Sequence, residues 1–129
     1  MKTDVLAKTV RGFAVVLVAV ALLAGGVPAE ATTVDECQAA IGVLISATSA
    51  AESLSNKDAA GLLGKAQNAS LKLNQGKFAD ALQKLLDYQA KINDLSRARK
   101  PKISTDDFTT LSTKVADAIA CVQRLISGL

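Results

Sequence analysis

The chain has 129 residues, with 15 Lys and Arg against 12 Asp and Glu, and half of its residues are apolar. This length corresponds to one small domain, because two ordinary domains need a longer chain. It contains no histidine, which excludes His-based triads, His general bases and His metal ligands. We therefore expect a protein that is not an enzyme, with no catalytic residues, no metal and no cofactor.

The first 31 residues differ in composition from the rest of the chain. Twenty of them are apolar, against 44 of the other 98. Three basic residues come first, residues 13–24 are an uninterrupted apolar run, and Ala-Glu-Ala follows at 29–31. This three-part pattern is typical of a cleaved secretory signal peptide. We therefore expect residues 1–31 to be removed and residues 32–129 to form a single extracellular or cell-surface domain.

The alternative to a cleaved leader is an uncleaved membrane anchor, since residues 12–29 carry no charge. The strongly apolar run within them is shorter than the ~18 to 20 residues that a membrane span requires. A lipid anchor needs a cysteine where this chain has Gly26. We therefore expect no stable membrane span after processing.

The two cysteines, Cys37 and Cys121, both lie after the leader. An oxidising compartment favours a disulfide between them over two free thiols. A redox-active pair would more often have the spacing Cys-x-x-Cys. We therefore expect one structural disulfide.

The chain after the leader predicts four amphipathic helices and almost no strand. The first begins with a Thr-x-x-Glu capping box at 33–36, the second at Ser55, and the fourth at Ser104. The second ends before Gly76, which can adopt the left-handed conformation. The core stripes at helical spacing are Cys37, Ile41, Leu44, Ala47 and Ala51; Ala59, Leu62, Ala66, Ala69 and Leu73; Phe78, Ala81, Leu85, Tyr88, Ile92 and Leu95; and Phe108, Leu111, Val115, Ala118, Val122 and Leu125.

Short connections between four long helices predict an antiparallel up-down four-helix bundle. In that topology the start of the first helix and the end of the fourth lie at the same end of the bundle. Cys37 and Cys121 occupy those two positions. The disulfide and the bundle topology therefore support each other.

The stretch from Leu62 to about Leu125 resembles the FIMAH domain, a helical module of secreted bacterial proteins. The matching segments are Leu-Leu-Gly-Lys-Ala at 62–66, Gly-Lys at 76–77 with Ala-Leu at 81–82 and Leu-Asp-Tyr at 86–88, and Lys-Pro-Lys-Ile-Ser at 100–104 ahead of Leu111 and Ala-Ile at 118–119. The resemblance implies a three-helix core, to which this chain adds an N-terminal helix and a disulfide. It also implies a non-catalytic accessory or interaction module, with no active-site residues.

One charge cluster stands out, formed by Arg97, Arg99, Lys100 and Lys102 around Pro101. It has two interpretations. The first is compensation of the helix dipole together with a solvated loop. The second is a contact with an anionic envelope component or a protein partner. We do not expect a nucleic-acid partner, because the three aromatic residues after the leader fall on core stripes and leave no stacking platform.

Other polar groups have simpler structural explanations. Asp106 and Asp107 fit a helix start better than a metal site. The Ser and Thr residues of 46–55 lack a base partner for nucleophilic catalysis, and the glycosylation sequon at 68–70 lies inside a predicted helix.

Two classes of function remain. The first is a small secreted, non-catalytic binding or structural module that contacts a partner through an exposed helix face. The alternative is an exported carrier of an apolar ligand or an inhibitor of a secreted enzyme. An exposed apolar strip would favour the first class, with Val43, Leu63, Leu71, Leu82 and Leu86 as its candidate residues.

Cleavage after Ala31 predicts the N-terminus of the extracellular protein. N-terminal sequencing should read Thr32-Thr33-Val34. A full-length chain retained in the membrane fraction would contradict this prediction and support the uncleaved anchor.

Overall fold

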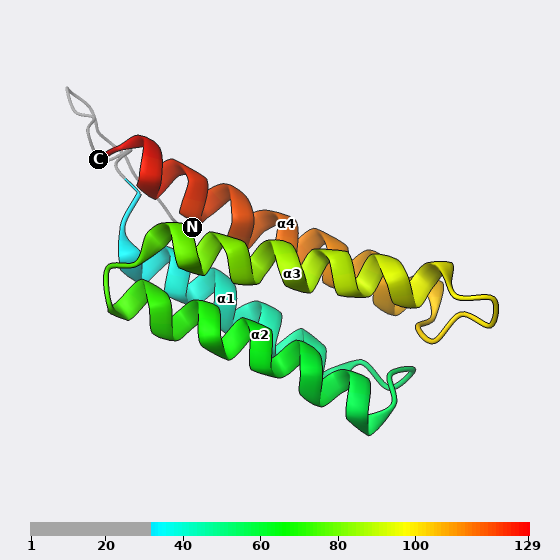
Figure 1. The fold of residues 1–129 in the computed structure, drawn as a ribbon. Coiled ribbons are helices and arrows are strands. Elements are labelled where there is room, and N and C mark those ends of the chain that lie inside the picture. The colour runs from blue at the N-terminus through cyan, green and yellow to red at the C-terminus, as the bar shows by residue number, and fades with distance from the viewer. Residues whose placement is uncertain (1–31) are drawn as a thin grey trace, which may run out of the picture. The chain divides into compact units, whose positions relative to one another are not determined.

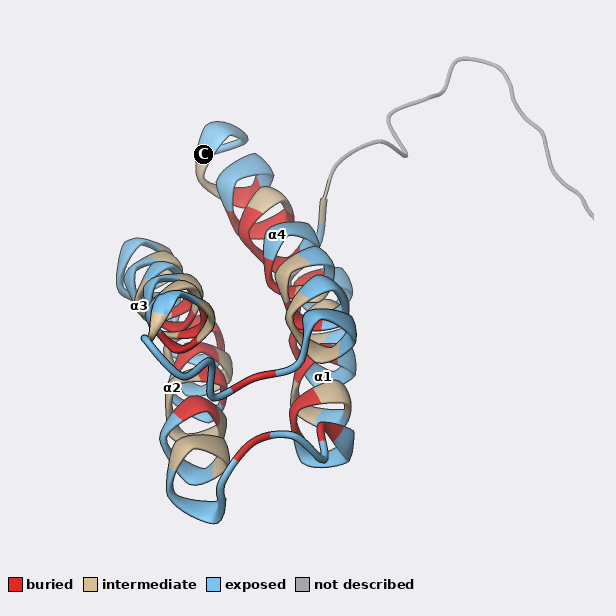
Figure 2. Cartoon of the chain, turned by 90° about the vertical axis from the view of Figure 1, so that its right-hand side faces the viewer, coloured by how far each residue is buried: buried red, intermediate tan, exposed pale blue. Residues whose placement is uncertain are grey.

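A computed structural model describes residues 32–129 and contains no strand in that range. Its four helices are α1 (Val34–Ala50), α2 (Asn56–Asn74), α3 (Phe78–Arg97) and α4 (Thr105–Ser127). They lie side by side along their lengths (Figure 1). Because α1 and α3 each pack on both α2 and α4, the helices occupy four corners (Figure 2). The predicted all-helical fold is confirmed, whereas the predicted leader lies outside the described residues.

Helices α1, α2 and α4 begin where the sequence predicts. At the start of α1, the backbone N–H of Thr33 donates to Glu36 Oε1 at 2.9 Å, and the N–H of Glu36 donates to Thr33 Oγ1 at 3.1 Å. Ser55 and Ser104 each accept a hydrogen bond from the N–H three residues further on, at 3.1 Å. These side chains satisfy N–H groups that have no partner within the helix.

A single glycine reverses the chain between α2 and α3. Gly76 has a φ of +76°, and its N–H donates to the carbonyl of Leu73 at 3.0 Å. The N–H of Lys77 donates to the carbonyl of Lys72 at 2.9 Å. These two bonds form a Schellman motif, in which a side chain at Gly76 would be strained. α3 begins at Phe78, directly after Lys77, so this short turn holds α2 and α3 close together.

The core lies between the four helices and contains the predicted stripes. Every stripe residue is buried except Ala47, Ala59, Phe78 and Phe108, which are half-buried. Five buried residues lie outside those stripes: Cys121, which the sequence analysis had assigned to the disulfide, and Thr48, Leu54, Ile103 and Ile119, which it missed.

A hydrogen bond connects two core residues on helices that are not neighbours. Thr48 of α1 and Tyr88 of α3 are both fully buried, and their hydroxyl oxygens are 2.6 Å apart. The Thr48 hydroxyl donates its one proton to the carbonyl of Leu44 at 2.7 Å. It must therefore accept from Tyr88. This bond crosses the middle of the bundle between opposite corners.

The predicted disulfide is confirmed. Cys37 in α1 is bonded to Cys121 in α4, with the two Cα atoms 5.5 Å apart and a separation of 84 positions in the sequence. Neither of the two cysteines is free. The bond closes most of the described chain into one loop.

Removal of the disulfide should destabilise the protein without changing its helices. The chain-entropy model assigns about 4 to 5 kcal/mol to a loop of this length. We expect a Cys37→Ala, Cys121→Ala double variant to lose roughly 2 to 5 kcal/mol of unfolding free energy in a denaturant titration. Far-ultraviolet circular dichroism of the folded variant should match that of the parent. An unchanged unfolding midpoint would contradict the stabilising role.

Burial raises the pKa of Tyr88 to about 12, with the hydrogen bond to Thr48 acting in the opposite direction. A raised pKa in the folded state means stability that is complete below pH 10 and is lost as the pH rises toward 12. The chain has one Tyr and no Trp, so the ultraviolet absorbance of tyrosinate reports this group alone. We expect Tyr88 to ionise at a higher pH in the folded protein than in the unfolded chain. In the Tyr88→Phe variant, we expect the unfolding free energy to change less with pH in the alkaline range. A titration near 10 in the folded protein would contradict this.

Candidate functional site

The connection between α1 and α2 and the connection between α3 and α4 lie at the same end of the bundle (Figures 1 and 2). Ser53 joins them. Its Oγ donates to Asp107 Oδ2 at 2.5 Å, and its N–H donates to the same oxygen at 3.1 Å. Its Oγ also accepts from the N–H of Ser104 at 2.9 Å. One serine therefore fixes the α1–α2 connection to the start of α4.

These contacts change the electrostatics of Asp107. The hydrogen bond from the Ser53 side chain, followed by the one from its backbone, holds the pKa of the Asp107 carboxyl below its usual value. Donors stabilise the ionised form of a carboxyl group. The sequence analysis assigned Asp107 only to the helix start, and the structure adds a contact 54 residues away in the chain.

The connection that carries the predicted basic cluster folds back on α3. The N–H of Lys102 donates to the carbonyl of Leu95 at 3.0 Å, and the next residue, Ile103, is 95% buried. These two contacts fix residues 98–104, which we call the basic loop. A loop held in this way presents its side chains from a defined position.

The structure places all four predicted contact residues in solvent. Arg97 ends α3, Arg99 and Lys100 lie in the basic loop before Pro101, and Lys102 follows it. Each of the four is exposed. No acidic residue occurs between positions 97 and 105, so this segment carries positive charge only.

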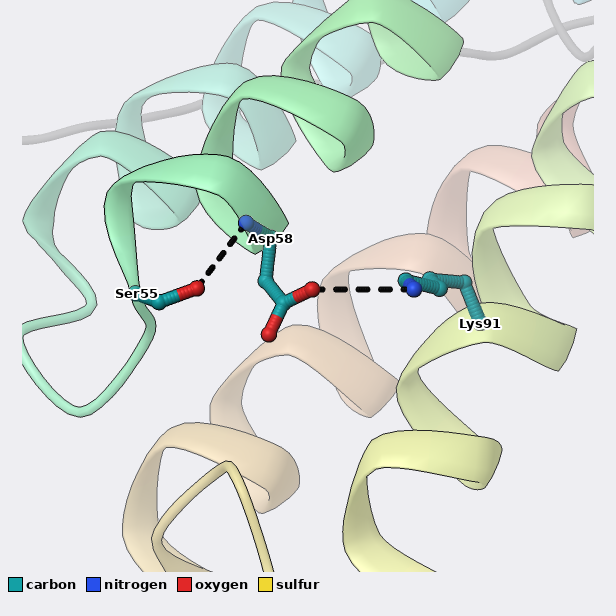
Figure 3. A network of polar contacts seen from close by, with 3 residues as sticks. All are labelled: Ser55, Asp58 and Lys91. Carbon is teal, nitrogen blue, oxygen red and sulfur yellow. Dashed lines mark hydrogen bonds and ion pairs between the residues drawn. The ribbon is translucent and has the colours of Figure 1, made fainter.

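A hollow of about 420 Å³ lies beside the basic loop, and of the four cations only Lys102 lines it. Asp58 also lines it, with one oxygen 3.6 Å from Lys91 Nζ and its backbone N–H bonded to Ser55 Oγ (Figure 3). The remaining lining residues are Ser53, Leu54 and Ser55. The hollow is open and its lining is equally polar and apolar, and Asp58 places an acidic group in it together with Lys102.

A second hollow, of about 350 Å³, lies at the opposite end of the bundle. Its lining is mostly apolar and combines the start of α3 with the end of α4, including Phe78, Ile126 and Leu129. This is the kind of lining that an apolar ligand requires. The hollow is open on one side.

Ser70, the serine of the glycosylation sequon at 68–70, has a structural role in the fold. Ser70 Oγ donates to Gln38 Oε1 at 2.5 Å, and Gln38 Nε2 donates to the Ser70 carbonyl at 2.9 Å and to Asn74 Oδ1 at 2.8 Å. These bonds connect α1 and α2.

Within residues 32–129, no helix is long and apolar enough to cross a membrane, and no three His, Cys, Asp or Glu residues gather as a possible metal site.

The structure exposes three of the five candidate residues for an apolar strip. Val43, Leu71 and Leu86 are exposed, whereas Leu63 and Leu82 are half-buried. Val43 lies on α1 and Leu86 on α3, which occupy opposite corners of the bundle. The exposed residues therefore belong to separate faces of the bundle.

Comparison with family models, with curated proteins and with solved structures finds no match to this chain.

Because Ser53 donates hydrogen bonds to Asp107, we expect substitution of Asp107 to lower the stability of the protein more than substitution of the neighbouring Asp106. Asp107→Asn should lower the unfolding free energy by up to about 1 kcal/mol, because it weakens solvent-exposed hydrogen bonds. Asp106→Asn is the matched control, since Asp106 is exposed in the same first turn. The pKa of Asp107 is lowered in the folded protein. Its contribution to the unfolding free energy is therefore complete above the unfolded-state pKa, and is lost as the pH falls through the folded-state pKa. Equal effects of the two variants in thermal unfolding at pH 7 would contradict this role.

Proposed function

We propose that this chain is a small secreted, non-catalytic binding module of the bacterial cell surface, and that the basic loop with Arg97 contacts an anionic envelope component. The proposal includes the cleaved leader, the antiparallel up-down topology and the FIMAH-like core of residues 62–125. A single observation carries it. Three exposed cations, Arg99, Lys100 and Lys102, lie on a loop that a backbone hydrogen bond and a buried isoleucine hold in place, and a fourth, Arg97, ends the helix before it.

Dipole compensation does not explain this cluster fully. Cations compensate a helix dipole only within its last turn, which here includes Arg97. Arg99, Lys100 and Lys102 follow the helix, and among the described residues none of them forms a salt bridge. Three cations therefore remain available for an external anion.

The disulfide supports the extracellular part of the proposal. A disulfide between distant helices persists in an oxidising compartment and is rare in the cytosol. The leader pattern at residues 1–31 points to the same compartment independently.

The test measures binding of the purified protein to isolated bacterial envelope. A variant with Arg97, Arg99, Lys100 and Lys102 all changed to Gln should bind at least tenfold more weakly. Binding of the parent should fall steeply between low and physiological salt, because exposed charges are screened over about 8 to 10 Å. Thermal unfolding of the variant should match that of the parent, since the four side chains are exposed.

A matched control removes the same charge elsewhere. Lys57, Lys65, Lys72 and Lys84, on α2 and α3, change to Gln. This control variant should keep its envelope binding. Equal loss in both variants would indicate attraction to bulk charge, and no loss in either would refute a role for the loop.

The alternative function, an exported carrier or inhibitor, is favoured by the apolar hollow at the other end of the bundle. The loop substitutions do not touch that hollow. An apolar ligand bound equally well by the parent and by the loop variant would therefore support the carrier.

A further inference from the structure

The fold protects most of the peptide bonds that follow a Lys or Arg residue. Of the twelve Lys and Arg residues in the described chain, eight lie in helices, where the backbone is coiled and hydrogen-bonded. Lys77 lies in the turn between α2 and α3, and Arg99, Lys100 and Lys102 lie in the basic loop. Proteases bind their substrates as extended segments, so exposed loops are the preferred sites of cleavage. Only the bonds after these last four residues are therefore candidates for a protease that cuts after Lys or Arg.

The bonds after Lys77 and Lys102 are held by the fold. The N–H of Lys77 is bonded to the carbonyl of Lys72 at 2.9 Å, and α3 begins at the next residue. The N–H of Lys102 is bonded to the carbonyl of Leu95 at 3.0 Å, and the next residue, Ile103, is buried in the core. A protease reaches either bond only after these contacts break.

Pro101 protects the bond after Lys100. The leaving nitrogen of that bond belongs to the proline ring and carries no N–H. Proteases that cut after Lys or Arg cleave poorly before proline, because the ring is bulkier than an ordinary amide group at this position. Among the described residues, the Arg99–Lys100 bond is the candidate that remains.

The Arg99–Lys100 bond is exposed, and the backbone beside it is extended. Both side chains are exposed, and the basic loop projects from the end of the bundle (Figure 1). Ala98 has a φ of −59° and a ψ of 150°, and the proline that follows Lys100 restricts that residue to extended conformations. Within the described chain, no backbone hydrogen bond holds residues 98–101. Their N–H and C=O groups are therefore free to pair with the backbone of a protease cleft.

We propose that the Arg99–Lys100 bond is a processing site for an extracellular protease that cuts after Lys or Arg. Water adds across the bond, so that the carbonyl carbon of Arg99 becomes a carboxylate and the nitrogen of Lys100 becomes a new terminal amine. The Arg99 guanidinium is the group that pairs with the acidic specificity pocket of such a protease. The inference rests on the secreted location in the proposed function, but it does not rest on the envelope contact.

The disulfide keeps the two parts of the cleaved chain together. Cleavage leaves residues 32–99, which contain α1, α2 and α3, and residues 100–129, which contain α4. Cys37 lies in the first part and Cys121 in the second. α4 also packs on both α1 and α3, so its buried side needs no continuous chain. The product is therefore one folded protein in two parts, which separate only when it is reduced and unfolded.

Contacts on the far side of the cut hold the start of α4 in place. The N–H of Lys102 donates to the carbonyl of Leu95, and the N–H of Ser104 donates to Ser53 Oγ at 2.9 Å. These two bonds join the second part to α3 and to the α1–α2 connection. Cleavage therefore changes the basic loop and leaves the four helices as they are.

Cleavage also divides the basic cluster. Arg97 and Arg99 stay on the first part, whereas Lys100 and Lys102 begin the second. The cut places a carboxylate beside Arg99 and removes the covalent bond that fixes the two pairs of cations relative to each other. Cleaved protein should therefore bind isolated envelope at least tenfold more weakly than intact protein. Intact protein that does not bind would refute the envelope contact and would leave the cleavage site unaffected.

Limited digestion of the purified, oxidised protein with trypsin tests the site. Mass spectrometry should find a single early cut, after Arg99, and the product should have gained the mass of one water. In a denaturing gel, the two parts should migrate together without reductant and separately with it. Early cuts at similar rates after Lys77 or within the helices would contradict the protection that the fold gives.

Substitutions in the loop test which bond is cut. Arg99→Gln should slow cleavage at least tenfold, because the specificity pocket loses its cation. Lys102→Gln is the matched control, since it removes a charge from the same loop at a bond that the fold protects, and it should leave the rate unchanged. Adding Pro101→Ala to Arg99→Gln should restore cleavage, now after Lys100. Equal rates in Arg99→Gln and the parent, or no rescue by Pro101→Ala, would refute the assignment.

Protein recovered from the culture medium of the cells that make it shows whether the site is used. N-terminal sequencing should read Lys100-Pro101-Lys102 in addition to the start of the first part, and the two parts should separate on a denaturing gel after reduction. Intact chain alone in the medium would refute processing and leave the proposed secretion standing. A chain that is absent from the medium would refute both.

Discussion

The disulfide between Cys37 and Cys121 is the constraint on which the position of α1 depends. It joins the beginning of α1 to the last turns of α4, while Ser53 joins the other end of the α1 segment to the first turn of α4. The polar contact between Thr48 and Tyr88 connects α1 to the opposite corner between these two points. The helix is therefore held at both ends and on its inner side.

These connections matter because only part of α1 consists of strong helix formers such as its four Ala residues. It contains a glycine, two Ile, two Val and several Ser or Thr residues, which form helices less readily than Ala, Leu or Lys. It also has no basic residue in its last turn to interact with the dipole. Tertiary contacts must supply the stability that its own sequence does not.

Periodicity predicted most of the core, and capping chemistry predicted the starts of α1, α2 and α4. Both signals are local, because a helix places residues three and four apart on the same face. Thr48 was missed because its hydroxyl makes it look polar, although it bonds within its own helix and to Tyr88. Ile103 was missed because its burial depends on how the basic loop folds back on α3.

The contacts that the sequence could not reveal join distant segments. The bond between Ser53 and Asp107 depends on the two connections meeting at one end of the bundle. The positions of the candidate strip residues relative to one another depend on the fold in the same way. Helical phase shows that Val43 and Leu86 point outward, but it does not show that their helices occupy opposite corners. Which helices are neighbours is a property of the whole fold.

The proposed contact and the fold depend on different physical forces. Charge attraction at the basic loop weakens as ions screen it over about 8 to 10 Å. The fold is held by a buried apolar core and a disulfide, which such screening does not weaken. Rising salt should therefore release the protein from an anionic partner while leaving the four helices intact.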